Sequence, residues 1–529
     1  MSERDARGAA RDLARAGMLV TGALMVSRVL GWVRVAVIAA SLGIGRELDV
    51  YTAAFRIPDF LFQLVAAGAL ASAVIPTIAA LVAGGERARA WRVVSTIANI
   101  LLVSLAALAA AAFLAAPALA PLIAPGFGAE ATARLVELTR ILLLSPIFLA
   151  LSAVATSVLN SAGRFAASVL APIIYNVVII GAAVALVPTF GLAGLAWGTV
   201  AGAAGTLLVQ LAPVVRQARF VYTPRIDVRD REARRTLLLL GPRAIGMAGG
   251  QLTLVVLTML GSTLEPGAIG AFALAFTIFQ IPLGTIAYPL GIVALPALSE
   301  RVAAGGIDGY VTLVTRALRL LGFAMLPIAA IAAGVAGEVV DLVIHFGRVG
   351  ESGIALTGTA FLGLLAALPT EAMIIVLSRA FFAARNTWIP VAAALASVVV
   401  AVGTATLLVG SAGILGLALG LVAASWVEAA ILLVAFRVRH AQLGLLGLGR
   451  AHAWYAAAAA IAAIVADHAY DFAAGAVGAD RGVLPAALAL AVAGSVGVAT
   501  YVGLAAAFRV PELGSSLRLV RAGLRRGVA

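Results

Sequence analysis

Long apolar runs separated by short polar connections form the dominant pattern of this 529-residue sequence. A helix that crosses a membrane needs about 20 consecutive apolar residues, and on that criterion the pattern predicts fourteen spanning helices. Several runs exceed this length, so we expect tilt or proline kinks, at Pro58, Pro76, Pro282, Pro289 and Pro296. The predicted spans are 16–42, 50–83, 92–121, 134–160, 165–188, 191–215, 236–263, 267–299, 310–337, 352–384, 388–409, 412–436, 451–468 and 483–507.

The apolar pattern occurs twice, in the same order and about 220 residues apart. A direct repeat in a membrane chain forms two like bundles, an architecture typical of transporters. We therefore predict an all-α polytopic membrane protein with two parallel six-helix repeats (N- and C-lobes) around a central cavity, plus two extra C-terminal helices. The matched segments are Phe190–Gly198 with Ala412–Gly420, Ala162–Arg164 with Ala383–Arg385, and Pro76 and Gly84-Gly85 with Pro296 and Gly305-Gly306.

The predicted organisation follows from the repeat and the polar connections. It comprises an N-terminal segment 1–15, an N-lobe 16–216, a basic linker 217–235, a C-lobe 236–438, two further spans within 451–508, and a basic tail 509–529.

Composition supports a membrane protein. Hydrophobic residues make up 63% of the chain and charged residues 12%, and a soluble globule cannot bury so much apolar surface. The net charge of +13 comes from arginine, since the chain has no lysine. In a membrane chain this excess does not indicate a nucleic-acid partner. The absence of cysteine excludes disulfides.

Arginine placement predicts the orientation, because positive residues are retained on the cytoplasmic side. The opposite connections hold only Arg46, Arg348 and Arg481, each with acidic neighbours. Both termini are therefore expected in the cytoplasm, which requires an even number of spans. The arginine-rich connections hold Arg87, Arg89, Arg164, Arg216, Arg219, Arg225, Arg229, Arg231, Arg234, Arg301, Arg385, Arg437, Arg439 and Arg450, and the tail adds Arg509, Arg518, Arg521, Arg525 and Arg526.

Arginines near mid-bilayer are the candidate binding residues. Each costs about 2.5–3.5 kcal/mol on insertion scales, and Arg28 and Arg34 lie inside the first span while Arg56 begins the second. Guanidinium groups facing water suit an anionic substrate, above all phosphate. The alternative is that they snorkel to the interface or pair with carboxylates, such as Asp59 one turn after Arg56. The other acidic candidates are Glu137, Glu371 and Glu428, and Arg140, Arg243, Arg316 and Arg319 are interpreted as solvated or headgroup contacts.

Glu371 and Glu428 are the acidic residues inside the second half. Either is a candidate proton or sodium site, and pairing with Arg379 is the alternative.

No catalytic set is found, so we predict a transporter with no catalytic residue, metal site or cofactor. The four histidines are scattered, with no HExxH, Walker loop or nucleophile elbow. The glycine-rich stretch 191–205 lies in a span, where small residues favour close helix packing over nucleotide binding. The one enzymatic alternative is Glu47-x-Asp49, since polyprenyl-phosphate-dependent membrane glycosyltransferases hold a metal with such carboxylates.

Ser27–Arg34 closely resembles the span-one signature of the MurJ (MviN) lipid II flippase family, within the multidrug/oligosaccharidyl-lipid/polysaccharide exporter superfamily. The resemblance runs from about residue 16 to about 440. It implies export of the undecaprenyl-diphosphate-linked peptidoglycan precursor through a cationic cavity that opens alternately to each side. Further matches are Asp49, Phe55–Pro58, Gly68-Ala69, Pro76, Leu159-Asn160, Arg164-Phe165, Ala171-Pro172, Asn176, Gly194–Gly198, Pro242, Gln251, Pro282, Leu295-Pro296 and Phe381–Ala383.

The chain departs from the family pattern where the family has charged residues. Phe62 and Gln63 stand where span two often has an arginine, Ala67 replaces an acidic residue, and Thr277 replaces an arginine of span eight. The residues that hold sodium in some members have no match here. The resemblance implies three substrate-binding residues, Arg28, Arg34 and Arg56. The proposed gate and support residues are Asp49, Asp59 and Asn176.

The resulting hypothesis is a multi-pass flippase of the bacterial inner membrane that moves lipid II to the outer leaflet by alternating access for cell wall synthesis. Membrane lipids and the cell wall synthesis machinery are its expected partners. The alternatives are a flippase for another polyprenyl-linked glycan, a small-molecule exporter, and the glycosyltransferase.

Overall fold

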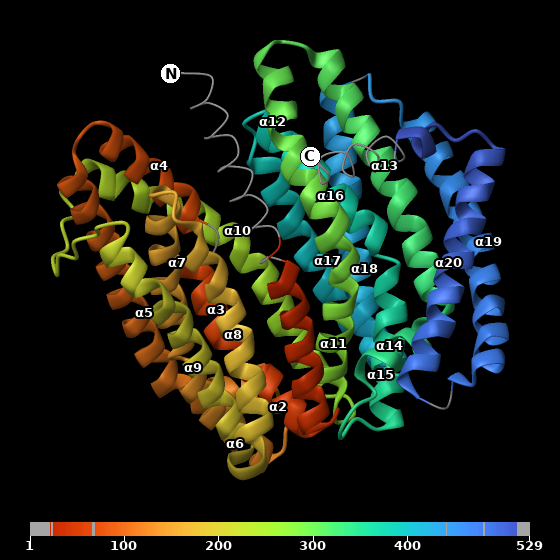
Figure 1. The fold of residues 1–529 in the computed structure, drawn as a ribbon, viewed down its shortest axis with the longest axis horizontal. Coiled ribbons are helices and arrows are strands. Elements are labelled where there is room, and N and C mark those ends of the chain that lie inside the picture. Colours follow the sequence, from red (N-terminus) through yellow and green to blue (C-terminus); the bar gives the residue numbers. More distant parts are fainter. Residues whose placement is uncertain (1–21, 23–24, 66–68, 441, 480–481, 516–529) are drawn as a thin grey trace. The chain divides into compact units, whose positions relative to one another are not determined.

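The computed structural model describes residues 22, 25–65, 69–440, 442–479 and 482–515. Every regular element among them is a helix (Figure 1), which confirms the all-α prediction. After the first span, Met25–Leu42, the helices are α2 Arg46–Ala54, α3 Arg56–Val65, α4 Ala69–Ala83, α5 Arg87–Ile123, α6 Ala129–Leu142, α7 Ser145–Ser161, α8 Phe165–Ala185, α9 Val187–Arg216, α10 Arg231–Ser262, α11 Ala268–Pro282, η1 Leu283–Ala287, α12 Tyr288–Ala303, α13 Ile307–Gly334, α14 Ala336–Ile344, α15 Glu351–Leu365, α16 Leu368–Ala383, α17 Trp388–Ala412, α18 Ile414–Arg439, α19 Leu445–Val477 and α20 Val483–Ala507.

The multi-pass character is confirmed. Within the described residues eleven helices are long and apolar enough to cross a membrane, or twelve if the bent pair α15 and α16 is one span. Two predicted spans lie outside this number: 50–83 corresponds to α3 with α4, and 236–263 corresponds to α10. The total of fourteen therefore stays a prediction.

The chain divides by its internal contacts into two compact units. Unit 1 is Met1–Gly270 with Phe346–Val349, and unit 2 is Ala271–His345 with Gly350–Ala529. Helix α10 packs against α3, α4 and α5 and so belongs to unit 1, although the sequence repeat places it first in the second half. The units are defined by contacts within the structure, whereas the predicted lobes are defined by the sequence repeat. The bounds of the lobes therefore stay predictions.

The two repeats share their turn geometry. Gly191, between α8 and the body of α9, has φ 55° and ψ −140°, and Gly413, between α17 and α18, has φ 55° and ψ −131°. Glycine reaches this region at little cost because it has no Cβ. Gly85 and Gly305, at φ 80° and 70°, form a second matched pair. The same glycine turns therefore recur at the positions that the predicted repeat pairs.

Proline breaks also recur in the two repeats. Helix α7 begins with Ser145-Pro146 after a break from α6, and α16 begins with Leu368-Pro369 after a 48° bend from α15. Of the predicted kinks, Pro282 ends α11 and is followed by the π-helical turn η1. The sequence pattern did not reveal the breaks at Pro146 and Pro369, because each lies within one continuous apolar run.

Small residues bring neighbouring helices close together. This agrees with the interpretation of the glycine-rich stretch 191–205 as a helix-packing segment. A Cβ on Gly198 of α9 would collide with Ala182 of α8. A Cβ on Gly420 of α18 would lie 2.8 Å from the Cβ of Ala405 in α17. The stretch is therefore a packing surface.

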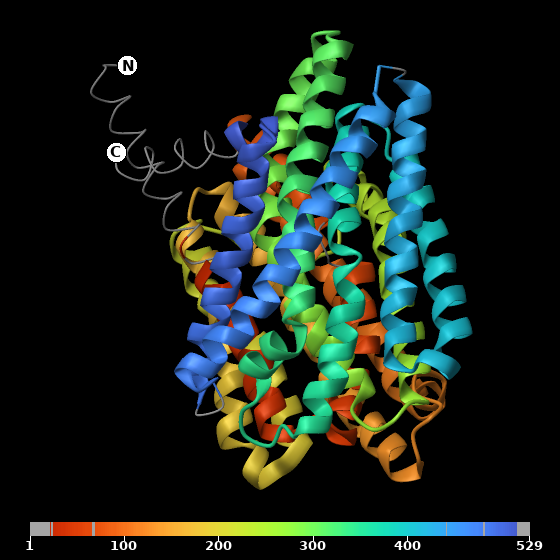
Figure 2. The ribbon, with the colours of Figure 1, turned by 90° about the vertical axis from the view of Figure 1, so that its right-hand side faces the viewer.

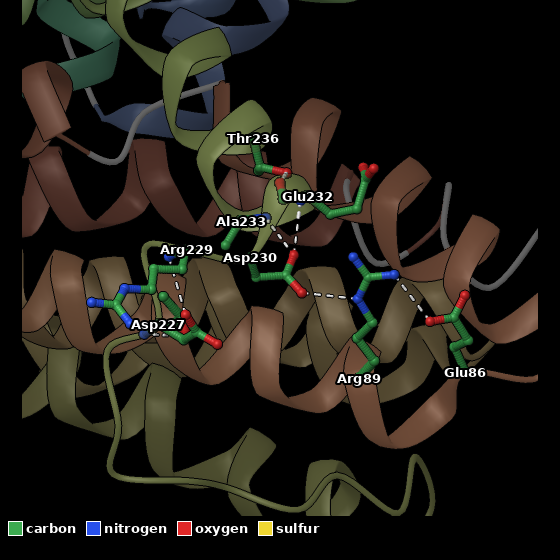
Figure 3. A network of polar contacts seen from close by, with 9 residues as sticks. Glu86, Arg89, Asp227, Arg229, Asp230, Glu232, Ala233 and Thr236 are labelled. Atoms are coloured by element: carbon green, nitrogen blue, oxygen red, sulfur yellow. Dashed lines mark hydrogen bonds and ion pairs between the residues drawn. The ribbon is translucent and has the colours of Figure 1, made fainter.

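The linker after α9 is fastened to α5. Asn99 Nδ2 donates to the carbonyls of Thr223 and Arg225, at 3.0 and 2.9 Å. Asp230 caps α10 by accepting from the N–H groups of Glu232 and Ala233, and Arg89 Nε lies 2.8 Å from its other oxygen (Figure 3). Burial alone would raise the pKa of Asp230, but these hydrogen bonds hold it below its usual value.

The last two helices pack on each other and on α13 within unit 2 (Figure 2). Helix α20 has the predicted bounds 483–507, whereas α19 extends beyond the predicted 451–468 at both ends. Tyr455 and Tyr501 pack against Phe323 of α13, with ring centroids 5.6 and 5.1 Å away.

Candidate functional site

The predicted arginines of the first two spans lie in unit 1. Arg28 is exposed, whereas Arg34 and Arg56 are half-buried. Asp59 lies within electrostatic range of both Arg34 and Arg56. The structure therefore brings together three of the residues selected from sequence.

An aromatic ring holds Arg34. Its guanidinium carbon lies 5.4 Å from the centroid of the Tyr175 ring on α8. A cation–π contact of this kind orients the guanidinium without neutralising its charge.

A hydroxyl holds Arg56. Arg56 Nε donates to Thr258 Oγ1 at 2.6 Å, and Thr258 lies 2% exposed on α10. Among the described residues no carboxylate lies within 4.0 Å of the Arg56 guanidinium, so the ion pair with Asp59 that the spacing allows is not formed. The printed hydrogen-bond partner of Arg56 is therefore a neutral hydroxyl.

Asn176 ties α8 to the first span. Its buried side chain donates from Nδ2 to the carbonyls of Ser27, at 3.2 Å, and Pro172, at 3.0 Å. Ser27 precedes Arg28, and Asn176 follows Tyr175. One turn of α8 thus supports the first span at Arg28 and at Arg34.

Asp49 caps a helix start. Its side chain is fully buried, Oδ2 accepts from Gly267 N at 2.7 Å, and Oδ1 accepts from Gly270 N at 2.9 Å. Burial raises the pKa of Asp49 to about 6, although the two backbone hydrogen bonds lower it. Both oxygens are thus committed to the N-terminal turn of α11.

The metal-binding alternative at Glu47 and Asp49 has no structural support. Glu47 Oε1 lies 3.6 Å from Arg134 Nη1, and the oxygens of Asp49 accept backbone N–H groups. No group of three potential metal-binding side chains occurs among the described residues.

A second polar group lies in unit 2 at the break between α15 and α16. Thr370 Oγ1 lies 2.9 Å from Ser425 Oγ, and Trp426 Nε1 donates to the carbonyl of Ala366, which the break leaves free. Glu428 accepts from Ser397 Oγ at 2.8 Å.

The alternative pairing of Glu371 or Glu428 with Arg379 is not formed. In the part of the chain that the structure describes, neither carboxylate lies within 4.0 Å of that guanidinium. The group at the break is instead held by hydrogen bonds that involve no arginine.

Uncharged side chains stand at the described positions where the chain departs from the family pattern. Phe62 packs against buried apolar residues including Leu61 and Leu105, and Thr277 Oγ1 donates to its own helix at Ala273. Ala67 lies outside the described residues. The cationic group of unit 1 is therefore Arg28, Arg34 and Arg56, with Tyr175 and Thr258 as partners that no sequence spacing indicated.

Comparison with known proteins gives a consistent result. A family model described as "Lipid II flippase MurJ" matches residues 38–476. A probable lipid II flippase MurJ of Rhizobium meliloti (strain 1021) is 30% identical over 428 residues, 78% of each chain. A probable lipid II flippase MurJ of Vibrio cholerae is 26% identical over 466 residues, 86% of this chain and 88% of that one.

Solved structures show the same fold. A structure of lipid II flippase MurJ in an inward closed conformation matches with a TM-score of 0.77 at 20% identity, covering 93% of this chain and 98% of the other. An inward-facing multidrug resistance MATE family transporter of the MOP superfamily matches with a TM-score of 0.66 at 19% identity, covering 80% and 98%.

Proposed function

This chain belongs to the MurJ lipid II flippase family, and on that premise we propose that it translocates lipid II across the membrane for cell wall synthesis. It is a transporter and not an enzyme, as its family and its transporter-like fold indicate. Translocation by alternating access needs a site that is reached first from one side and then from the other.

The observation that carries the proposal is the pair of half-buried arginines held by neutral partners. Tyr175 orients Arg34 and Thr258 orients Arg56, so neither guanidinium group forms an ion pair with the residues that the structure describes. The diphosphate of a polyprenyl-linked precursor presents oxygens that guanidinium forks bind two at a time. Arg28 adds a third cation on the first span.

Gate and support residues have separate roles in this proposal. Asn176 fixes the first span against α8, and Asp49 holds the start of α11. Asp59 lies close enough to Arg34 and Arg56 to attract both when no diphosphate is bound.

We place the protein in the bacterial inner membrane with both termini in the cytoplasm. The arginine-rich connections support this orientation. The cell wall synthesis machinery is the proposed recipient of the flipped precursor.

A reconstituted flipping assay with purified lipid II tests the proposal. Arg34→Ala and Arg56→Ala should each lower the flipping rate at least tenfold, because a hydrogen bond to a charged group contributes about 1.5–3 kcal/mol. Arg140→Ala is the matched control, since Arg140 contacts only Phe113 among the described residues and is expected to keep full activity.

Complementation provides a second readout. The wild-type chain should replace an essential lipid II flippase in depleted cells, and the Arg34→Ala variant should fail at equal membrane abundance. Failure of the wild type, or normal growth with the variant, contradicts the substrate or the site respectively.

A further inference from the structure

Unit 2 contains a cavity of about 800 Å³ at the end where α13 and α19 begin and α20 ends. One face of α13 lines it, including Thr312, Arg316 and Arg319. The start of α19 at Gly447 and the turn after α20 at Glu512 complete the wall. None of these residues belongs to the cationic group of unit 1.

Arg316 is the uncompensated cation of this wall. It is exposed and makes no hydrogen bond or ion pair with the residues that the structure describes. Its neighbour Arg319 is neutralised, because Nε lies 2.8 Å from Glu512 Oε1. Asp308, the other acidic lining residue, lies eight residues earlier on α13, about 12 Å along the helix axis.

The start of α19 lines the same cavity at Gly444, Gly447 and Leu448. The N-cap residue Gly444 provides no side-chain cap, and no acceptor among the described residues takes the N–H groups of Leu446 and Gly447. A Cβ on Gly447 would meet nothing within 4 Å, so the space beside this cavity-lining residue is open. Free N–H groups at a helix start beside an arginine favour a phosphate oxygen.

We propose that this cavity binds the phosphate of an acidic phospholipid headgroup. Arg316 and the first turn of α19 hold the phosphate oxygens, and Thr312 and Ser515 line the space beside them. A lipid is the source because the cavity lies at the ends of three spanning helices, where headgroups are concentrated. The sequence after Ser515 adds four arginines and no acidic residue, which attracts the same lipids.

Titration of the purified full-length protein in detergent tests the site. Short-chain phosphatidylglycerol should bind and raise the thermal midpoint, while short-chain phosphatidylcholine and inorganic phosphate at equal concentration should not. Arg316→Gln should weaken phosphatidylglycerol binding about tenfold, as expected for loss of one charge-assisted hydrogen bond.

Two further variants distinguish a specific site from general surface charge. Arg450→Gln removes an exposed arginine of α19 that does not line the cavity, and binding should stay unchanged. Gly447→Glu places a carboxylate in the open space and should abolish binding, whereas Gly447→Ala should preserve it. Equal effects of Arg316→Gln and Arg450→Gln overturn the site, and an equal response to inorganic phosphate overturns the lipid assignment. Lipid II flipping is not the readout, so failure here leaves the proposed function intact.

Discussion

At the scale of the residue, the partner of each arginine decides whether it can bind substrate. An intramembrane guanidinium beside a carboxylate is already neutralised, whereas one held by a hydroxyl or an aromatic ring retains its charge. Arg56 bonds to Thr258 and Arg34 contacts Tyr175, so a neutral partner orients each guanidinium group.

Thr258 should act as a positioning residue for Arg56. Thr258→Val keeps the side-chain volume but removes the acceptor of the 2.6 Å hydrogen bond, and we expect lipid II flipping to fall about tenfold. Thr258→Ser retains the hydroxyl and should restore most of the rate. Full activity of the valine variant at equal protein amount would show that Arg56 needs no such support.

The buried carboxyl group of Asp49 should make the unfolding free energy of the protein depend on pH. Burial raises the pKa of Asp49 from 3.8 to about 6 in the folded protein. The stabilisation that the protonated Asp49 side chain contributes is therefore fully present below pH 4 and is lost as the pH rises through 6. The loss amounts to about 3 kcal/mol of unfolding free energy at neutral pH. Asp49→Asn removes the titrating group, so its stability relative to the wild type should increase from pH 4 to pH 7.

Unfolding in detergent across this pH range measures the effect. Glu47→Gln is the control in the same helix, α2, because it replaces a carboxylate that is 44% exposed. A constant stability difference between the wild type and Asp49→Asn from pH 4 to pH 7 would contradict the prediction.

The residues of the site were only partly predictable from sequence. A charge inside an apolar run is visible without a structure, so Arg28, Arg34 and Arg56 could be selected. Tyr175 and Thr258 could not, because each lies more than 100 residues from its arginine and is an ordinary residue for a span. The role of Asp49 as a helix cap was likewise hidden, since its donors are the backbone N–H groups of Gly267 and Gly270.

At the scale of the element, the glycine turn that joins two helices is the feature shared by both repeats. Gly191 and Gly413 have nearly the same φ and ψ, in a region that costs a residue with a Cβ about 1–3 kcal/mol. The motif around each glycine was the strongest repeat in the sequence, and the structure gives the physical reason for that repetition.

Gly413→Ala should therefore destabilise unit 2. We expect a lower thermal midpoint, corresponding to about 1–3 kcal/mol, because alanine cannot adopt φ 55° and ψ −131° without strain. Gly410→Ala is the control in the helix that Gly413 ends, since Gly410 lies within α17 with open space around its Cβ position and should gain stability. Equal midpoints for the two variants would exclude strain at Gly413.

Span lengths were easier to predict than span breaks. Hydropathy located α20 at 483–507 because a polar connection bounds each end. The bend between α15 and α16 was not predicted because Leu365 to Leu368 is apolar throughout, and the compensating bond from Trp426 to Ala366 joins residues 60 apart. Hydropathy therefore reveals where the chain crosses a membrane but not where a crossing helix is interrupted.

At the scale of the whole molecule, the charge of the cargo couples translocation to the membrane potential. Moving one charge across 100 mV changes its free energy by about 2.3 kcal/mol, so a diphosphate of charge about −2 gains roughly 4–5 kcal/mol when it leaves a negative interior. Vesicles containing the protein and lipid II, with a potassium gradient and valinomycin, should accumulate lipid II in the outer leaflet when the interior is negative and in the inner leaflet when it is positive. The Arg34→Ala, Arg56→Ala double variant should show slow redistribution under either sign, which separates carriage by these arginines from leakage. A final distribution that does not depend on the sign of the potential would mean that the headgroup crosses with compensating cations, so that translocation carries no net charge.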